Sequence, residues 1–296
     1  EHLSHGFGDR AIFQDVSFRM LEGEHIGLIG ANGEGKSTFM SIITGTLMPD
    51  EGKIEWAKNV RVGYLDQHTV LEKGMTVREV LTSAFDFLFE MEEKMNHICD
   101  NMGEMSPDEM DTAMEELGTI QDLLMMHDFY MIDSKVDEVA RALGLTDIGL
   151  DRDVTDLSGG QRTKVLLAKL LLEKPDILLL DEPTANLDIA TRKEITRTLK
   201  DMKDVTETVM IATHDMQLVC EWAERIIVLY QGKVVGDGTR DEIFGNTSLS
   251  SLVGIRPPEI FLMGQALKEQ ALCYTVDEFL HCFQKQGGIR YADKAV

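Results

Sequence analysis

The segment 25–38, HIGLIGANGEGKST, decides the fold. A short apolar run ending at Gly30 predicts a buried strand, and residues 37–44 predict a helix. The turn between them matches G-x-x-x-x-G-K-[ST], in which glycines let backbone N–H groups converge on phosphate oxygens at a helix start. Lys36 supplies a charge for the outer phosphates, and the Ser37 hydroxyl is suited to hold magnesium. The predicted phosphate-binding residues are Gly30, Asn32, Gly33, Gly35, Lys36, Ser37 and Thr38.

A second motif, ILLLDE over residues 177–182, is an apolar strand that ends in two carboxylates. Packing gives a buried strand no reason to end this way, whereas metal chemistry does. Asp181 is suited to the magnesium shell, and Glu182 is suited to orient or deprotonate an attacking water. With the phosphate loop on the same chain, the predicted ligands are ATP and Mg²⁺.

A third motif, LSGGQ over residues 157–161, opens a predicted helix over 161–173. A hydroxyl and free N–H groups at a helix start form a second anion site. Two phosphate-binding turns on one chain favour a nucleotide that is shared across a two-fold interface between two chains. The residues predicted for this turn are Ser158, Gly159, Gly160 and Gln161.

Short apolar segments alternate with helical ones along the rest of the core. Strands are predicted at 61–65, 177–180, 209–213 and 225–230, with helices at 161–173 and 189–200. This alternation predicts an α/β fold with a mostly parallel sheet covered on both faces. Ligands of such sheets bind at the carboxyl ends of the strands, where these motifs fall.

Together the three motifs resemble the ABC ATPase family over nearly the whole chain. The resemblance implies a RecA-like P-loop core with an ABC helical subdomain at about 80–160, within a nucleotide-binding domain spanning residues 1–247. Residues 248–296 are predicted to form a small tail of accessory or dimerisation helices. In that family the Ser-Gly-Gly turn of one subunit closes on the γ-phosphate held by the other. The implied activity is hydrolysis of Mg-ATP at a head-to-tail dimer interface, which drives an open–closed motion.

Four more residues match the family pattern by position. Gln67 resembles the glutamine that senses magnesium and the attacking water, and His214 resembles the histidine that contacts the γ-phosphate. Asp188 lies where the family has a loop that crosses the dimer interface. Phe7 lies where an aromatic ring stacks on adenine.

The two ends of the chain resemble different subfamilies. Through the motifs at 27–33, 63–67 and 157–172, residues 1–187 resemble the ABC-F group, soluble ATPases that act on the ribosome. Through the motifs at 212–215, 232–239 and 242–244 and the helical tail after 257–258, residues 188–296 resemble ATPase subunits of energy-coupling-factor importers of the cobalt and vitamin type. A natural divergent protein and a chimera both account for this pattern. The abrupt change from one subfamily's sequence motifs to the other's near residues 185–188 favours the chimera, which could hydrolyse little ATP. The candidate partners are a second copy of the chain or another ABC domain, membrane subunits, or the ribosome.

The amino-acid composition limits which kinds of partner the chain can bind. The net charge is −23, from 52 acidic and 29 basic residues, which argues against broad electrostatic binding to nucleic acid. No apolar run is long enough to span a membrane, and four scattered cysteines suit reduced thiols, so we expect a cytoplasmic protein that reaches the membrane only through a partner.

Residues 85–135 differ in amino-acid composition from the rest of the chain. This stretch holds fourteen acidic residues, two lysines and nine of the seventeen methionines. It predicts a helical excursion with methionines as core filler and the acids as a solvated face. The alternative is an arm that docks a partner.

Overall fold

The computed structural model describes all residues of the chain except 67–68, 70, 186, 203–207, 268–271 and 285–296. Contacts divide the chain into two compact units. Unit 1 comprises Glu1–Gln67 with Asp176–Val296, and unit 2 comprises His68–Pro175. Unit 2 encloses the predicted helical range 80–160, while the C-terminal helices group with the sheet in unit 1.

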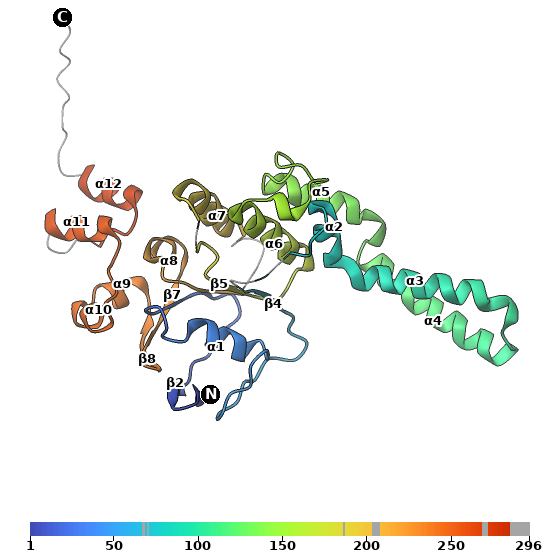
Figure 1. Ribbon diagram of the computed structural model, residues 1–296, viewed down its shortest axis with the longest axis horizontal. Helices are drawn as coiled ribbons and strands as arrows, with labels where there is room; N and C mark the ends of the chain where they lie inside the picture. Colours follow the sequence, from blue (N-terminus) through green and yellow to red (C-terminus); the bar gives the residue numbers. More distant parts are fainter. Residues whose placement is uncertain (67–68, 70, 186, 203–207, 268–271, 285–296) are drawn as a thin grey trace, which may run out of the picture. The chain divides into compact units, whose positions relative to one another are not determined.

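Unit 1 is built on a six-stranded sheet with the order β4-β5-β6-β3-β7-β8, beside a separate hairpin of β1 and β2 (Figure 1). All neighbours in the large sheet are parallel except β7 and β8, which confirms the predicted mostly parallel α/β fold. The strands are β1 Leu3–Phe7, β2 Arg10–Val16, β3 His25–Ile29, β4 Val62–Leu65, β5 Ile177–Asp181, β6 Thr208–Ala212, β7 Arg225–Tyr230 and β8 Lys233–Gly238. The helices are α1 Lys36–Ile43, α7 Ile189–Met202, α8 Met216–Trp222, α9 Arg240–Phe244, α10 Thr247–Val253, α11 Glu259–Leu267 and α12 Val276–Gln284.

Strand β3 is buried on both faces, as its apolar composition predicts. On one face Ile26 and Leu28 share an apolar core with Phe39 of α1 and Phe13 of β2. On the other face a β-carbon on Gly27 would meet Val219 of α8 at 3.0 Å. Helices α1 and α8 therefore cover opposite faces of the sheet (Figure 1).

The register places three strand ends side by side. In the parallel pairing Leu28 of β3 is opposite Ala212 of β6, and Ala212 is also opposite Asp181 of β5. The loops that follow these strands therefore leave from one edge of the sheet. This edge carries the phosphate loop, Glu182 and the segment 213–215.

The C-terminal helices of unit 1 pack around a buried tyrosine. Tyr274 stacks on Phe261 with ring centroids 5.1 Å apart, and the Arg240 guanidinium lies 4.7 Å from the centre of the tyrosine ring. Arg240 also donates to the Cys220 carbonyl of α8 and pairs with Glu278 of α12 at 2.7 Å. These contacts join the tail to the helices beside the sheet.

Unit 2 is helical and has its own apolar core. Its α-helices are α2 Val77–Thr82, α3 Asp86–Asn101, α4 Pro107–Met126, α5 Ile132–Ala142 and α6 Gly159–Glu173; short 3₁₀ segments cover Ser83–Phe85, Met102–Glu104, Phe129–Met131 and Val154–Asp156. Helices α3 and α4 form an antiparallel pair (Figure 1), joined by an ion pair between Lys94 and Glu116. Within the described residues, no helix of either unit is long and apolar enough to cross a membrane.

Most methionines of unit 2 fall into two groups. One group packs against the core, as predicted for Met91, Met95, Met102 and Met105; Met75, which lies before the predicted stretch, does the same. The filler interpretation is wrong for the other group, which is largely exposed: Met114, Met125, Met126 and Met131.

Candidate nucleotide site

The phosphate loop joins β3 to α1 with the geometry that its glycines require. Gly33 and Gly35 have φ angles of +87° and +90°, which disfavour any side chain. A β-carbon on Gly35 would lie 2.5 Å from Cγ2 of Ile12, and one on Gly30 would lie 2.6 Å from the Leu229 carbonyl oxygen. The loop is thus pressed against β2 and β7, and only glycine fits at these positions.

Lys36 begins α1 and points its ammonium group back into the loop. The residue is only 6% exposed, and Nζ donates to the carbonyls of Gly30 at 3.0 Å and Ala31 at 3.4 Å. Nζ also lies 3.7 Å from Oε1 of Glu182. A buried ammonium needs such partners, because burial without them is costly.

Glu182 is the most heavily contacted carboxylate of the site. Its Oε2 accepts hydrogen bonds from the Thr213 hydroxyl at 3.0 Å and from the His214 backbone N–H at 3.3 Å. The Nδ1 atom of His214 lies 2.8 Å from the same oxygen. Glu182 also has a φ of +48°, a strained conformation for a residue with a side chain and one that clusters at functional sites.

Asp181, at the end of β5, is 1% exposed. Burial raises the pKa of its carboxyl group, while a hydrogen bond with Ser37 acts in the opposite direction. Within the described part of the chain its Oδ1 atom has no hydrogen-bond partner. A buried carboxylate oxygen beside a serine hydroxyl is a donor set that suits Mg²⁺, so the residues present fit this ion.

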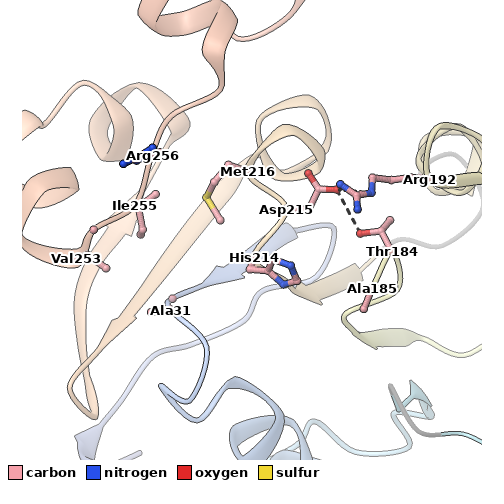
Figure 2. Close-up of a pocket in the computed structure, with 12 residues that line it drawn as sticks. Ala31, Thr184, Ala185, Arg192, His214, Asp215, Met216, Val253, Ile255 and Arg256 are labelled. Carbon is pink, nitrogen blue, oxygen red and sulfur yellow. Dashed lines mark hydrogen bonds and ion pairs between the residues drawn. The ribbon is translucent and has the colours of Figure 1, made fainter. Parts of the chain in front are cut away.

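A pocket of about 460 Å³ adjoins this edge of the sheet (Figure 2). Its walls come from the phosphate loop at Gly30 and Ala31, from the segment 184–185 after β5, from Arg192 of α7, from residues 214–216 at the start of α8, and from residues 253–256. Figure 2 shows His214 between Ala31 and the segment that holds Thr184. The predicted γ-phosphate contact therefore borders a cavity of ligand size.

Asp215 links two walls of this pocket. It caps α8 by accepting from the Leu218 N–H at 3.1 Å. Its other oxygen accepts from the Thr184 hydroxyl at 3.4 Å and lies 3.7 Å from Nε of Arg192 (Figure 2). Thr213 and Asp215 were missed in the sequence analysis as structural parts of the site, although both flank His214 directly after a strand.

The other predicted residues have distinct settings. Phe7 ends β1 and is 56% exposed. Asp188 caps α7, accepting from the N–H groups of Ala190 and Thr191 and from the Thr191 hydroxyl. In the loop, Asn32 and Ser37 are exposed and Thr38 is half-buried. Gln67 lies outside the described residues, so its predicted role stays a prediction.

The Ser-Gly-Gly turn belongs to unit 2, where it starts α6. The N–H of Gln161 donates to the Ser158 hydroxyl at 3.3 Å, and the Ser158 N–H donates to the Gln161 side-chain oxygen at 2.9 Å. This reciprocal capping box fixes the turn. Gly159 is exposed and Gly160 is buried. The predicted closure of the turn on a nucleotide held by another chain remains a prediction.

A sequence profile of the ABC transporter family matches residues 13–185, more than half of the chain. This chain belongs to the ABC transporter ATPase family. ABC ATPases hydrolyse ATP, and their domain binds nucleotide. One relative is the Bacillus subtilis "Uncharacterized ABC transporter ATP-binding protein YfmM". It is 75% identical over 186 residues, which cover 63% of this chain and 36% of that protein.

A second relative of this ABC ATPase domain is the "Energy-dependent translational throttle protein EttA". The Haemophilus influenzae protein is 34% identical over 224 residues, covering 76% of this chain and 39% of its own length. The Escherichia coli K12 protein is 33% identical over the same length. The chain therefore spans less than half the length of these curated relatives.

Two solved structures share the ABC fold at low identity. An "ATP binding subunit of ABC transporter" superimposes with a TM-score of 0.61 at 22% identity, covering 84% of this chain and 92% of that one. A "nucleotide-free ATP-binding cassette from an ABC transporter" gives a TM-score of 0.62 at 23% identity, covering 86% and 96%. At such identity the likeness concerns the fold alone.

Proposed function

We propose that this chain binds Mg-ATP on its phosphate loop and hydrolyses it when the Ser-Gly-Gly turn of a second ABC domain, normally another copy of the chain, closes on the γ-phosphate. The observation that carries the proposal is the meeting of Lys36, Glu182 and His214 at one edge of the sheet. Family membership supports the activity, because ABC ATPases bind and hydrolyse ATP.

Lys36 and Glu182 have complementary tasks in this proposal. Without phosphates nearby, the ammonium is balanced by the Glu182 carboxylate and two carbonyls. The outer phosphates of ATP offer Lys36 a stronger anionic partner, so binding would release Oε1 of Glu182. The carboxylate is then free to accept a proton.

In the hydrolytic step Glu182 accepts a proton from water as the water oxygen bonds to the γ-phosphorus. The bond from that phosphorus to the oxygen of ADP breaks, and inorganic phosphate and ADP leave. Thr213 and His214 keep Glu182 oriented through the hydrogen bonds to Oε2. His214 is 55% exposed, so its ring is also accessible to the γ-phosphate.

Magnesium would be held by Ser37 and Asp181, with Gln67 as a further predicted ligand. When bound, the ion neutralises charge that develops on the phosphate oxygens. The buried Oδ1 of Asp181, which has no hydrogen-bond partner in the described part of the chain, supports this assignment. The proposed interface has two-fold symmetry, so each of two nucleotides would be closed by the other chain.

The substitution Glu182→Gln tests the proposal. It keeps the size of the side chain but removes the proton acceptor, so ATP turnover should fall by about 100-fold or more. ATP affinity should be retained, and ATP should convert the variant from monomer to dimer in size-exclusion chromatography with light scattering. The matched control is the exposed Glu22→Gln, which should leave turnover unchanged.

Normal turnover by the Glu182→Gln protein would remove the assigned role of this carboxylate. If the original protein bound ATP but did not turn it over, the predicted chimera with little activity would be favoured. That outcome is separable from a failure to bind ATP at all.

A second candidate function is an action on translation, which the similarity to EttA favours. Under this candidate the Glu182→Gln protein, held in its ATP-bound form, should co-sediment with ribosomes, and the phosphate-loop variant Lys36→Ala should not. An ATPase subunit of a membrane importer predicts instead co-purification of membrane subunits with unit 2 of the chain.

A further inference from the structure

The hairpin of β1 and β2 brings a second candidate group to the nucleotide. In its antiparallel register Phe7, the predicted adenine platform, pairs directly with Arg10. Asp9 and Gly8, with φ +59°, form the tight turn between them. An aromatic ring and a guanidinium group therefore occupy the same end of one hairpin.

Strand β2 also lies against the phosphate loop. Ile12 and Phe13 are the residues that a β-carbon on Gly35 would meet, at 2.5 and 2.9 Å. Two residues earlier on β2, Nη2 of Arg10 lies 3.9 Å from the place where a β-carbon on Gly33 would be. The register with β1 is irregular at Ile12, so the placement of Arg10 beside the loop rests on this contact with Gly33 and not on strand alternation.

Among the residues that the structure describes, no ion pair joins Arg10 to a carboxylate, although the chain holds 52 acidic residues. The carboxylate nearest in sequence to Gly33 is Glu34, and it accepts instead from the Gln231 N–H. An exposed arginine that is left unpaired in a strongly acidic chain, beside a phosphate loop, has the chemistry of an anion ligand.

We propose that Arg10 is a nucleotide-binding residue that places its guanidinium on phosphate oxygens, between the base platform at Phe7 and the loop at Gly33. This inference rests on the proposed function. Lys36 acts on the outer phosphates from inside the loop, where it is buried. Arg10 acts from the outer side of the loop, and its planar fork matches two phosphate oxygens at once.

The test uses the full chain carrying Glu182→Gln as parent, so that a hydrolysable polyphosphate persists during calorimetric titration. The probes are ADP and inorganic tripolyphosphate, each with magnesium. Arg10→Gln should weaken binding of both probes by about tenfold, with Arg10→Lys in between, because a hydrogen bond to a charged phosphate is lost. Phe7→Ala should weaken ADP but leave tripolyphosphate unchanged, because only ADP carries a base.

The control Arg19→Gln removes the same charge from an exposed position further along the chain and should change neither affinity. The difference between the parent and Arg10→Gln should shrink at 1 M salt, since exposed charges are then screened. Thermal unfolding of each variant checks that the hairpin is intact.

Two results would overturn the assignment: Arg10→Gln binding both probes within twofold of the parent, or losing ADP affinity alone, which would place the effect on the ring and not on phosphate. Failure of the parent to bind either probe would instead overturn the proposed function together with this assignment.

Discussion

The two units of the chain differ in where their polar side chains lie, buried in unit 1 and at the surface in unit 2. Every described polar or charged side chain that is buried belongs to unit 1: His5, His25, Lys36, Asp181, Thr184, Thr198, Thr208 and Thr213. Unit 2 has an apolar core throughout its described part. Its polar groups instead cap helix starts at the surface, as at Thr76, Ser106 and Ser158.

This difference indicates that unit 1 buries polar groups for ligand binding, whereas the interior of unit 2 serves packing alone. Burying Lys36 and Asp181 is unfavourable in the absence of ligand, and the proposed polyphosphate and divalent ion would offset that cost. Unit 2 carries no such cost, and its contribution to the proposed site is a turn held by the capping box of Ser158 and Gln161.

The largest effect is expected from a matched pair of core truncations. Leu28→Ala in β3 and Leu124→Ala in α4 each remove a fully buried side chain, so each should lower the free energy of unfolding by about 2–5 kcal/mol. Only Leu28→Ala should also weaken ATP binding, because β3 leads directly into the phosphate loop. Urea unfolding and ATP titration on both variants measure the two quantities.

An equal loss of ATP affinity in Leu124→Ala would contradict the separation of roles. The same would hold if Leu28→Ala kept full affinity despite its lower stability.

A smaller effect of opposite sign is expected at Asp181. Asp181→Asn removes a buried negative charge whose Oδ1 lacks a hydrogen-bond partner among the described residues, so the nucleotide-free protein should gain about 1 kcal/mol of unfolding free energy. The added stability that Mg-ATP gives the original protein should be largely lost, because a ligand of the ion is missing. Differential scanning calorimetry with and without Mg-ATP checks both signs; destabilisation of the free protein would argue that Asp181 is a structural carboxylate.

The smallest effect is expected at the cap of α6. Ser158→Ala should cost about 1 kcal/mol, and Ser158→Asn should restore most of that stability, because asparagine also caps helices. If the turn also serves a nucleotide on another chain, both variants should turn over ATP more slowly while binding ATP normally. Turnover that follows stability alone would leave Ser158 as a cap and nothing more.

Much of this molecule could be predicted from short-range patterns. The strand at β7 lies exactly at the predicted residues 225–230, and α6 and α7 begin within two residues of prediction, because apolar periodicity and capping residues act locally. The sequence pattern did not predict which methionines of α4 are exposed, because helical spacing alone does not show which face of a helix packs against a neighbour.

The sequence by itself determined the phosphate loop, the carboxylate pair after β5 and the Ser-Gly-Gly turn, because each is a contiguous motif whose chemistry follows from adjacent residues. Only the tertiary structure decided that Lys36 meets Glu182, that Thr213 and His214 hold this carboxylate, and that Arg10 reaches Gly33. These groups lie on β2, in α1 and its preceding loop, and directly after β5 and β6. The register of the sheet and the packing of β2 on the loop bring them together.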